Sequence, residues 1–391
     1  MPVVTPGITV LCDSRLPSLQ DRRLGLLCNP ASVDRHLVHS RDLIRRAFPG
    51  QLKALYAPQH GFFAERQDNM VESADRRDPQ TGLPVFSLYG ETRVPTRAML
   101  DPIDVMLVDL QDVGTRVYTF IYTLSYCMEA ARQYGKTIVV LDRPNPLGGR
   151  RIEGNLLTAA CASFVGRYPI PMRHGLTVGE LARLFNERFG IGCELEVVDM
   201  RGWQRDMRFS HTGLPWVAPS PNLPTPASAM VYPGQVLWEG TNISEGRGTT
   251  QPFELFGAPF IDPQRVVDQI EAAHLSGVVL RPVEFEPTSH KWAGQTCRGF
   301  QIHVTDPAVF APVALSLELY RAIYHRYPDA FAYKPPPYEY EYERLPMDLI
   351  LGDRGVREQI ENGVSTADIV AGWRTPLAAY AKMIEAIRIY P

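Results

Sequence analysis

Polar and charged side chains follow three apolar segments of the sequence, directly where each segment ends. Continuous apolar segments of this length are typical of strands in a parallel sheet that is covered on both faces. In such sheets, ligands bind just beyond the carboxyl ends of the strands. The side chains concerned are Gln59 and His60 after LKALYA, Asp112, Arg116 and Tyr118 after VMLVD, and Asn145 after TIVVL. We therefore expect them to share one crevice.

The segment after the first of these strands is rich in side chains that could bind a ligand. Its polar members are Gln59, His60, Glu65, Asp68, Asn69 and Glu72. We interpret it as a loop whose side chains face the crevice. The alternative is a solvated loop in which His60 caps backbone groups.

Two ion pairs are expected at the same edge of the sheet. Asp112 and Arg116 are four residues apart, so they meet if the chain turns helical there. This pair is either a carboxylate held for contact with sugar hydroxyls or a salt bridge that only fixes the loop. Arg143 is expected to pair with Asp142 and to serve as scaffold.

Two further segments carry candidate substrate contacts. Asn145 and Glu153 lie in LDRPNPLGGRRIEGN, where prolines stiffen the chain and glycines permit unusual backbone shapes, and we place both near the substrate. Arg173 and His174 directly precede a predicted helix start, where backbone N–H groups and the helix dipole favour an anion. They could hold a ligand carboxylate, or His174 could act as a helix cap.

The densest group of polar and glycine residues is LWEGTNISEGRGTTQPFELFGAP, in the second half of the chain. Long irregular loops of this composition are uncommon unless they bind something, so we predict a functional role. Its candidate binding residues are Glu239, Asn242, Glu245 and Arg247, and Asn222 in PSPNLPT joins them from the preceding linker.

The order of predicted elements indicates an α/β fold with a Rossmann-like parallel sheet. Strand and helix patterns alternate through the first half, the segment 121–134 has apolar residues at helical spacing, and Thr177 with Glu180 forms a capping box that opens the next helix. A proline-rich stretch then marks a shift in composition. We predict a Rossmann-like α/β domain over residues 1–226 and a smaller α+β domain over 227–391 that completes the cleft.

The second domain is predicted to contain an antiparallel sheet and a long helix. Apolar and polar residues alternate over 276–306, as in antiparallel strands, and 307–328 is amphipathic. The segment 333–345, YKPPPYEYEYERL, is rich in proline and tyrosine and is interpreted as an extended strap on the surface.

Composition excludes several classes of function. The net charge of −3, without a run of lysine or arginine, argues against nucleic acid and anionic membranes as partners. No glycine-rich phosphate loop and no histidine spacing typical of metal sites occurs, so we predict neither cofactor nor metal.

Cysteine usage and the N-terminus bear on the compartment. The six cysteines form no C-x-x-C pair and are expected to be buried free thiols. No signal peptide is found, and no apolar run approaches the roughly 20 residues of a membrane span. This predicts a cytoplasmic protein, or an exported one if the start of the chain is incomplete.

The combination of carboxylates, amides and aromatic residues without metal ligands, a nucleophile elbow or a phosphate loop fits carbohydrate chemistry. Cleavage of a glycosidic bond needs one carboxylic acid to protonate the leaving oxygen. A second carboxylate usually acts as base or nucleophile, unless a 2-acetamido group of the substrate replaces it. Our catalytic candidates are Asp112, Glu153 and Glu72.

Nine motifs resemble segments of one known family. They are APQHGFF, TGLPVFSLYG, DLQDVGTRVYTFIYTL, VLDRPNPLGG, SFVGRYPIPMRHGLTVGELA, PSPNLPT, VYPG, EGTNISEGRGTTQPFE and RGFQIHVTD. In this order they resemble the exo-β-N-acetylmuramidase NamZ family, from about Arg23 almost to the C-terminus.

The resemblance implies a Rossmann-like N-terminal domain without a nucleotide, a smaller C-terminal domain, and an active site between them. It also implies release of N-acetylmuramic acid from the non-reducing end of peptidoglycan fragments during cell-wall turnover. On this resemblance, the anion site at Arg173 and His174 could receive the lactyl carboxylate of the muramic sugar.

One residue departs from the family pattern. Characterised members of the family carry a glutamate in P-E-H-G, proposed as the catalytic acid, whereas this chain has Gln59 in PQHG, as similar relatives do. An amide cannot donate a proton as a general acid at neutral pH. Either another carboxylate serves, or the protein is a glycosidase of altered specificity or a catalytically silent protein that binds peptidoglycan fragments.

Overall fold

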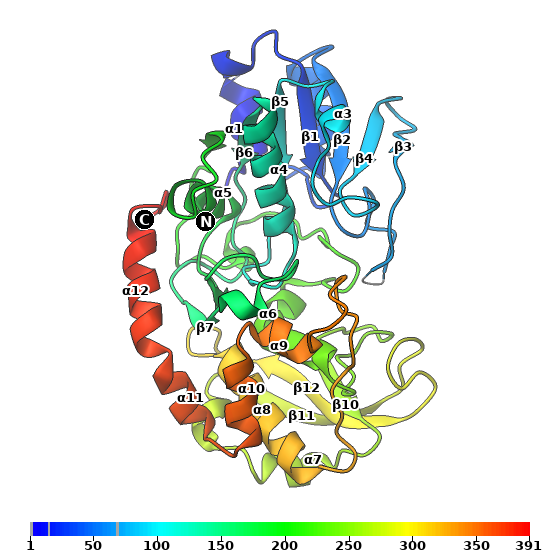
Figure 1. The fold of residues 1–391 in the computed structure, drawn as a ribbon, viewed down its shortest axis with the longest axis vertical. Helices are drawn as coiled ribbons and strands as arrows, with labels where there is room; N and C mark the ends of the chain where they lie inside the picture. The colour runs from blue at the N-terminus through cyan, green and yellow to red at the C-terminus, as the bar shows by residue number, and fades with distance from the viewer. Residues whose placement is uncertain (1–2, 15, 68–69) are drawn as a thin grey trace.

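A seven-stranded sheet organises the first half of the molecule (Figure 1) in the computed structural model, which describes residues 3–14, 16–67 and 70–391. The strand order is β3-β4-β2-β1-β5-β6-β9, and every pairing is parallel except that of β3 with β4. The strands are β1 (Leu24–Cys28), β2 (Leu52–Ala57), β3 (Arg76–Arg77), β4 (Pro84–Ser87), β5 (Val105–Asp109), β6 (Thr137–Leu141) and β9 (Glu194–Val198). The predicted Rossmann-like parallel sheet is confirmed.

Helices cover both faces of this sheet, because its central strands are apolar on both sides. The helices α4 (Phe120–Tyr134) and α5 (Val178–Arg183) pack on one face, and α1 (Gly7–Ser14) and α2 (Ser40–Ala47) pack on the other. The short helix α3 (Arg97–Leu100) precedes β5. The predicted helix over 121–134 is therefore confirmed.

The start of α5 follows the predicted capping box. The Thr177 hydroxyl accepts a hydrogen bond from the backbone N–H of Glu180 at 3.2 Å, and the Glu180 carboxylate accepts one from the backbone N–H of Thr177 at 3.0 Å. Two otherwise unpaired backbone donors are satisfied in this way.

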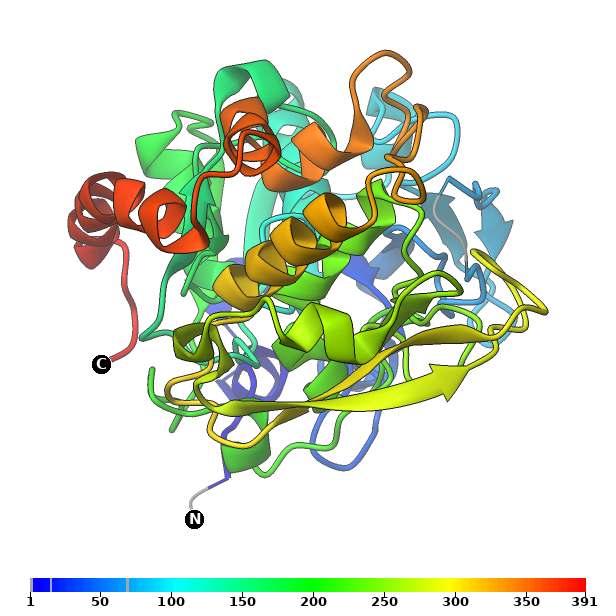
Figure 2. The ribbon, with the colours of Figure 1, turned by 90° about the horizontal axis from the view of Figure 1, so that it is seen from below.

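The second half is built around a three-stranded antiparallel sheet (Figure 2). Its strands, in the order β10-β12-β11, are β10 (Leu255–Ala258), β12 (Cys297–Val304) and β11 (Val278–Phe285). The helices of this half are α6 (Pro226–Gln235), α7 (Pro263–Val267), α8 (Pro312–Arg326), α9 (Pro346–Leu351), α10 (Arg354–Glu361), α11 (Thr366–Gly372) and α12 (Arg374–Glu385). The predicted antiparallel strands and the long helix are both present.

A small antiparallel ribbon joins the two halves. It consists of β7 (Glu153–Leu156) and β8 (Pro171–Arg173). The Glu153 side chain accepts hydrogen bonds from the backbone N–H groups of Val313 at 2.9 Å and Ala314 at 3.0 Å, at the start of α8. A carboxylate of the first half therefore stabilises the start of a helix in the second.

The C-terminal tail returns to the first half after α12, the red helix at the edge of Figure 1. The backbone N–H of Ile389 donates to Glu180 at 2.8 Å, and the Tyr390 hydroxyl donates to Asp142 at 2.6 Å. The two halves are thus connected by the linker before α6 and also by this tail.

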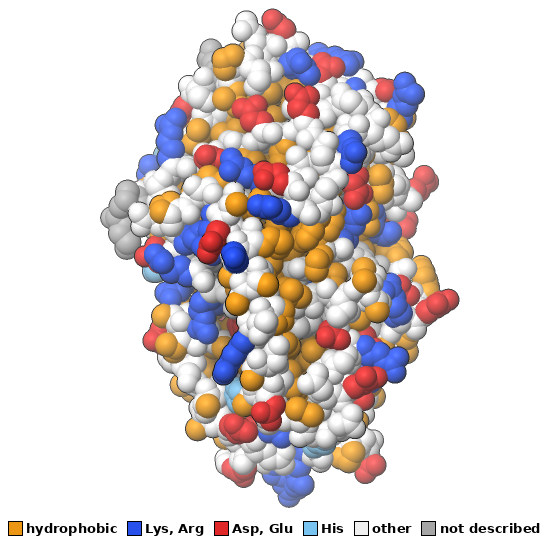
Figure 3. Space-filling model, turned by 60° about the vertical axis from the view of Figure 1, so that its left-hand side comes forward, with side chains coloured by type: hydrophobic (Ala, Val, Ile, Leu, Met, Phe, Trp, Pro, Cys, Tyr) orange, Lys and Arg blue, Asp and Glu red, His pale blue; other side chains and the backbone are white. Residues whose placement is uncertain are grey.

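The surface and the thiols agree with the composition. Lysine and arginine side chains are interspersed with aspartate and glutamate on the face shown in Figure 3. The six cysteines are free, and all except the half-buried Cys12 are buried, as predicted. No helix within the described ranges is both long and apolar enough to cross a membrane.

Candidate active site

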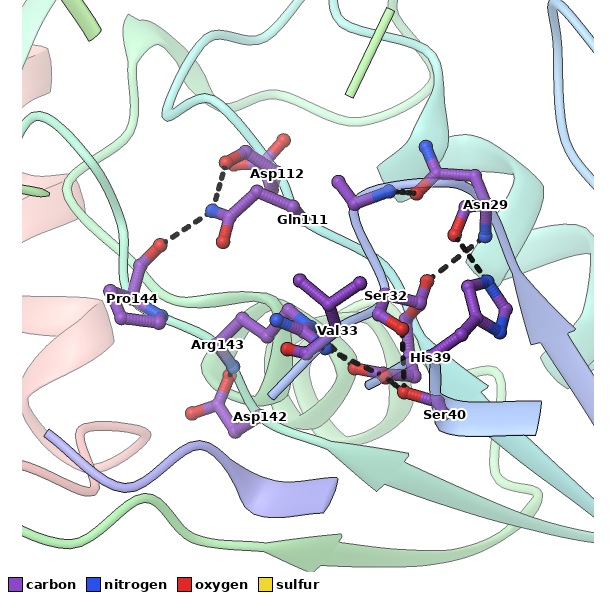
Figure 4. A network of polar contacts seen from close by, with 12 residues as sticks. Asn29, Ser32, Val33, His39, Ser40, Gln111, Asp112, Asp142, Arg143 and Pro144 are labelled. Carbon is purple, nitrogen blue, oxygen red and sulfur yellow. Dashed lines mark hydrogen bonds and ion pairs between the residues drawn. The ribbon is translucent and has the colours of Figure 1, made fainter. Parts of the chain in front are cut away.

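The carboxyl ends of the central strands are closed by the chain's own polar groups (Figure 4). The Arg143 guanidinium donates to the buried carboxylate of Asp109 at 2.5 and 2.8 Å. The Asn29 amide donates to the carbonyl of Pro219 in the linker at 2.8 Å. The expected side-chain pair of Arg143 with Asp142 is wrong, because the guanidinium turns to Asp109 and only the backbone N–H of Arg143 bonds to Asp142.

A cleft lies instead between the two halves, and it includes a pocket of about 30 Å³ that we call the inner pocket. Its polar lining comes from both halves: Gln59, His60 and Thr119 from the first, and Glu239, Arg247 and Glu339 from the second. A volume of this size holds about one water molecule.

A larger groove of about 520 Å³ adjoins the inner pocket on the second half, and we call it the outer groove. Glu239 and Arg247 line both spaces, so these two side chains stand at the boundary between them. Asn242, Glu245 and Lys291 add further polar groups to the outer groove. A ligand in either space can thus contact the same two charged groups.

Gln59 and Glu339 form the centre of the inner pocket. Gln59 Nε2 donates to Glu339 Oε1 at 3.0 Å, and the Tyr89 hydroxyl donates to Glu339 Oε2 at 2.6 Å. The Thr119 hydroxyl donates to Gln59 Oε1 at 2.5 Å. Because the amide oxygen of Gln59 accepts from Thr119, the amide nitrogen faces Glu339.

A row of alternating charges continues from the inner pocket into the outer groove. Arg247 Nη2 donates to Glu239 Oε1 at 2.6 Å, and the Tyr338 hydroxyl donates to Glu239 Oε2 at 2.7 Å. Arg247 Nε lies 3.3 Å from Glu245 Oε1, and Lys291 Nζ donates to Glu245 Oε2 at 2.7 Å. Each buried charge in this row therefore has a partner of opposite sign.

The surroundings of the acidic groups differ, and so do their pKa values. Burial, together with the charge of Glu239, raises the pKa of Glu339 above its ordinary value, although Tyr89 and Gln59 oppose this with hydrogen bonds. Burial alone would raise the pKa of Glu245, but the charges of Lys291 and Arg247 lower it instead. Glu339 therefore keeps its proton to a higher pH than an exposed glutamate does.

The structure brings together several residues that the sequence predicted for substrate binding. Those that line the inner pocket are Gln59, His60, Tyr118, Asn222, Glu239 and Arg247, and those that line the outer groove include Asn242 and Glu245. Their roles stay predictions, but their common location is a structural fact. Asp68 lies outside the described residues.

Asp112 and Arg116, the pair expected at the end of β5, point to different partners. Asp112 Oδ2 accepts from the backbone N–H of Gly114 at 2.8 Å and lies 3.3 Å from His174 Nε2. Arg116 is buried, and burial lowers its pKa to about 10. Its guanidinium donates to four backbone carbonyls, those of Asn155, Ile170, Ile350 and Leu351. The expected ion pair is therefore wrong.

The other predicted residues make contacts outside the lining of these two spaces. The Asn145 amide donates to the carbonyl of Leu176 at 2.9 Å, and Arg173 Nη2 donates to the carbonyl of Leu147 at 2.6 Å. Glu72 is exposed. Among the described residues that line the inner pocket and the outer groove, none is Glu72, Asp112, Arg116, Asn145, Glu153, Arg173 or His174.

Four functional candidates escaped the sequence analysis: Thr119, Tyr89, Tyr338 and Glu339. The interpretation of 333–345 as a surface strap is wrong at its centre, since Tyr338 and Glu339 are both 4% exposed and reach into the inner pocket. The only signal in the sequence was an acidic residue between tyrosines in a proline-rich segment.

Two family models match this architecture over almost its whole length. The model described as exo-β-N-acetylmuramidase NamZ, N-terminal, matches residues 24–227, and the corresponding C-terminal model matches residues 230–390. The chain belongs to the exo-β-N-acetylmuramidase NamZ family. Its relatives in this family include the peptidoglycan β-N-acetylmuramidase NamZ of Bacillus subtilis (strain 168), which is 44% identical over 389 residues, 100% of this chain and 92% of the relative.

Solved structures described as DUF1343 family proteins are similar to this NamZ family member. One crystal structure from Bacteroides fragilis NCTC 9343 is 34% identical, has a TM-score of 0.88, and matches 99% of both chains. A second from the same organism is 26% identical, with a TM-score of 0.78 over 100% of this chain and 99% of the other. The two-part architecture is therefore shared.

Proposed function

We propose that this protein is a peptidoglycan β-N-acetylmuramidase that releases N-acetylmuramic acid from the non-reducing end of peptidoglycan fragments. Family membership and the Bacillus subtilis relative support the reaction class. The observation that carries the proposal is the position of two buried carboxylates, Glu239 and Glu339, on one pocket between the two halves. Hydrolysis of a glycosidic bond generally uses two such groups.

Glu339 acts as the proton donor to the glycosidic oxygen. Its pKa is raised by burial and by the nearby charge of Glu239, so the protonated form that a general acid requires persists to higher pH. Gln59 cannot donate this proton, because its amide does not ionise near neutrality. Gln59 instead positions Glu339 through the 3.0 Å hydrogen bond, with Thr119 fixing the amide.

Glu239 supplies negative charge to the same pocket. Its two oxygens accept hydrogen bonds from Arg247 and Tyr338, which hold the carboxylate in place. The transition state of glycosidic cleavage resembles an oxocarbenium ion. A fixed carboxylate beside the sugar stabilises that developing positive charge.

Hydrolysis of a nitrophenyl N-acetylmuramide and of an N-acetylmuramyl disaccharide tests this proposal, with Glu339→Gln compared against Glu341→Gln. Glu341 lies two residues away and pairs with Arg344, outside the pocket. The loss of a general acid should lower kcat on the disaccharide by about 10²- to 10⁴-fold. The loss on the nitrophenyl substrate should be smaller, because nitrophenolate leaves without a proton.

Two results would contradict the proposal. Equal activity of Glu339→Gln and the parent protein on the disaccharide would remove Glu339 from the reaction. Binding of both substrates without any turnover by the parent protein would show a silent binding protein instead.

A further inference from the structure

Arg247 has one guanidinium nitrogen without a hydrogen-bond partner in the described part of the chain. Its Nη2 donates to Glu239 at 2.6 Å and its Nε lies 3.3 Å from Glu245. Its Nη1 is buried and has no hydrogen-bond partner among the residues that the structure describes. The side chain is only 9% exposed, so bulk water does not freely satisfy this donor. A buried charged N–H group left unpaired is costly, which indicates that a ligand completes it.

The position of Arg247 limits what that ligand is. Arg247 lines both the inner pocket and the outer groove, so its side chain borders the space available to a bound sugar. Glu239 and Glu245 occupy Nη2 and Nε, so Nη1 is the nitrogen left for a ligand. An arginine nitrogen in such a place prefers an anionic oxygen, because charge-assisted hydrogen bonds are about twice as strong as neutral ones.

The charges of the outer groove favour the same kind of ligand. Arg247, Lys291 and Lys334 line it as cations, against the carboxylates of Glu239 and Glu245. The Lys291 ammonium donates its three hydrogen bonds to Glu245 and to the backbone carbonyls of Trp238 and Ile243. The groove thus has a surplus of positive charge, and Arg247 Nη1 is its buried, unused donor.

We propose that Arg247 Nη1 binds the carboxylate of the lactyl ether at O3 of the muramic sugar, and that this contact distinguishes N-acetylmuramic acid from N-acetylglucosamine. The inference rests on the proposed function, since it assigns a specificity-determining residue within that site. N-acetylglucosamine carries a hydroxyl group at this position and has no anion to offer. Arg247 is a binding residue for the substrate in addition to holding Glu239.

Arg173 provides a matched comparison within the same chain. It is also a buried arginine, and its Nε is likewise unpaired in the described part of the chain. It lines neither the inner pocket nor the outer groove. If an unpaired buried guanidinium were sufficient, Arg173 and Arg247 would respond alike to the same ligand, whereas location in the cleft predicts that only Arg247 responds.

The experiment measures the affinity of the free sugars by isothermal titration calorimetry. The ligands are N-acetylmuramic acid, its methyl ester, which lacks the charge, and N-acetylglucosamine. The parent protein should bind the acid about 10- to 100-fold more tightly than the ester, as a charge-assisted hydrogen bond provides. Arg247→Lys should lose most of this preference, because its single ammonium is taken by Glu239 and Glu245, and Arg173→Lys should keep it.

Thermal unfolding shows whether each variant is folded. Should Arg247→Lys fail to fold, the double variant Arg247→Gln with Glu245→Gln is tested in its place. This double variant removes one charge of each sign. Equal binding of acid and ester by the parent protein, no binding of either, or an unchanged preference in the folded Arg247 variant would each overturn the inference. Turnover of the muramides is measured separately, so absence of hydrolysis refutes the proposed function while the affinity ratio still decides the role of Arg247.

Discussion

Replacing Gln59 with glutamate should place two buried carboxyl groups next to each other. Gln59 Nε2 lies 3.0 Å from Glu339 Oε1, so an oxygen in its place faces a second oxygen at about the same distance. Two unit charges at this separation repel by about 5 kcal/mol at an effective dielectric constant of about 20. That energy corresponds to about 4 pKa units, so the pair should share one proton through neutral pH.

The sign of the effect on stability follows from the proton balance. In the unfolded chain both glutamates have pKa values of about 4.3 and lose their protons above that pH. The folded Gln59→Glu variant keeps one proton, so folding becomes less favourable as the pH rises through the window between about 4.3 and the raised pKa of the pair. The slope is about 1.4 kcal/mol per pH unit for one extra proton.

Urea unfolding between pH 5 and pH 8 measures this slope for the parent protein, for Gln59→Glu, and for the exchanged variant Gln59→Glu with Glu339→Gln. The exchanged variant again has one amide and one carboxyl group, so it should recover most of the stability at pH 8. A stability deficit of Gln59→Glu that is the same at every pH would refute the reasoning. So would an exchanged variant that is as unstable at pH 8 as Gln59→Glu.

Two further predictions concern buried groups outside the cleft. Arg116→Met leaves four backbone carbonyls without their donor, so the free energy of unfolding measured in urea should fall by about 3 to 5 kcal/mol. An unchanged free energy of unfolding would show that water replaces the guanidinium. Burial raises the pKa of Asp142 to about 7, so this group destabilises the folded state as pH rises from about 4 to about 7. Asp142→Asn cannot ionise, so its free energy of unfolding should rise relative to that of the parent protein as the pH increases across this window, by about 4 kcal/mol at most. Urea unfolding at about pH 4 and about pH 7 measures this difference.

The sheet was predictable because the residue pattern within each central strand is sufficient to indicate it. Leu107 and Val139 face one helix layer while Val108 and Val140 face the other, so β5 and β6 are apolar at every central position. A strand that is apolar on both faces has few alternatives to a covered parallel sheet. The same local logic predicted the capping box at α5, because it involves residues only three positions apart.

The positions of the strand ends in the sequence did not indicate which of them line an open pocket and which are buried by other parts of the chain. Gln59 follows β2 and reaches the inner pocket, whereas Asp112 and Asp142 follow β5 and β6 and are buried by protein groups. Segments that are distant in the sequence cover these buried strand ends. The Tyr390 hydroxyl donates to Asp142, and the Asn29 amide beside β1 donates to the carbonyl of Pro219. Contacts over such sequence distances leave no periodic signal.

Glu339 was out of reach for a different reason. Glu339 and Tyr340 have positive φ angles of 47° and 66°, a backbone shape that single residues adopt only when their surroundings enforce it. Arg93 stacks on the Tyr340 ring at 3.7 Å, and the Tyr89 ring packs edge-on against it at 5.8 Å. These tertiary contacts, rather than local preference, turn Glu339 inward.

The return of the C-terminal tail constrains how substrate enters. The inner pocket, at about 30 Å³, is smaller than a sugar ring. The linker before α6, the buried Arg116 bonded to α9 and the tail around Tyr390 all tie the halves together, the tail on the side of α12 in Figure 1. Any motion that opens the cleft while it keeps these ties intact is largest at the opposite rim, around 334–345.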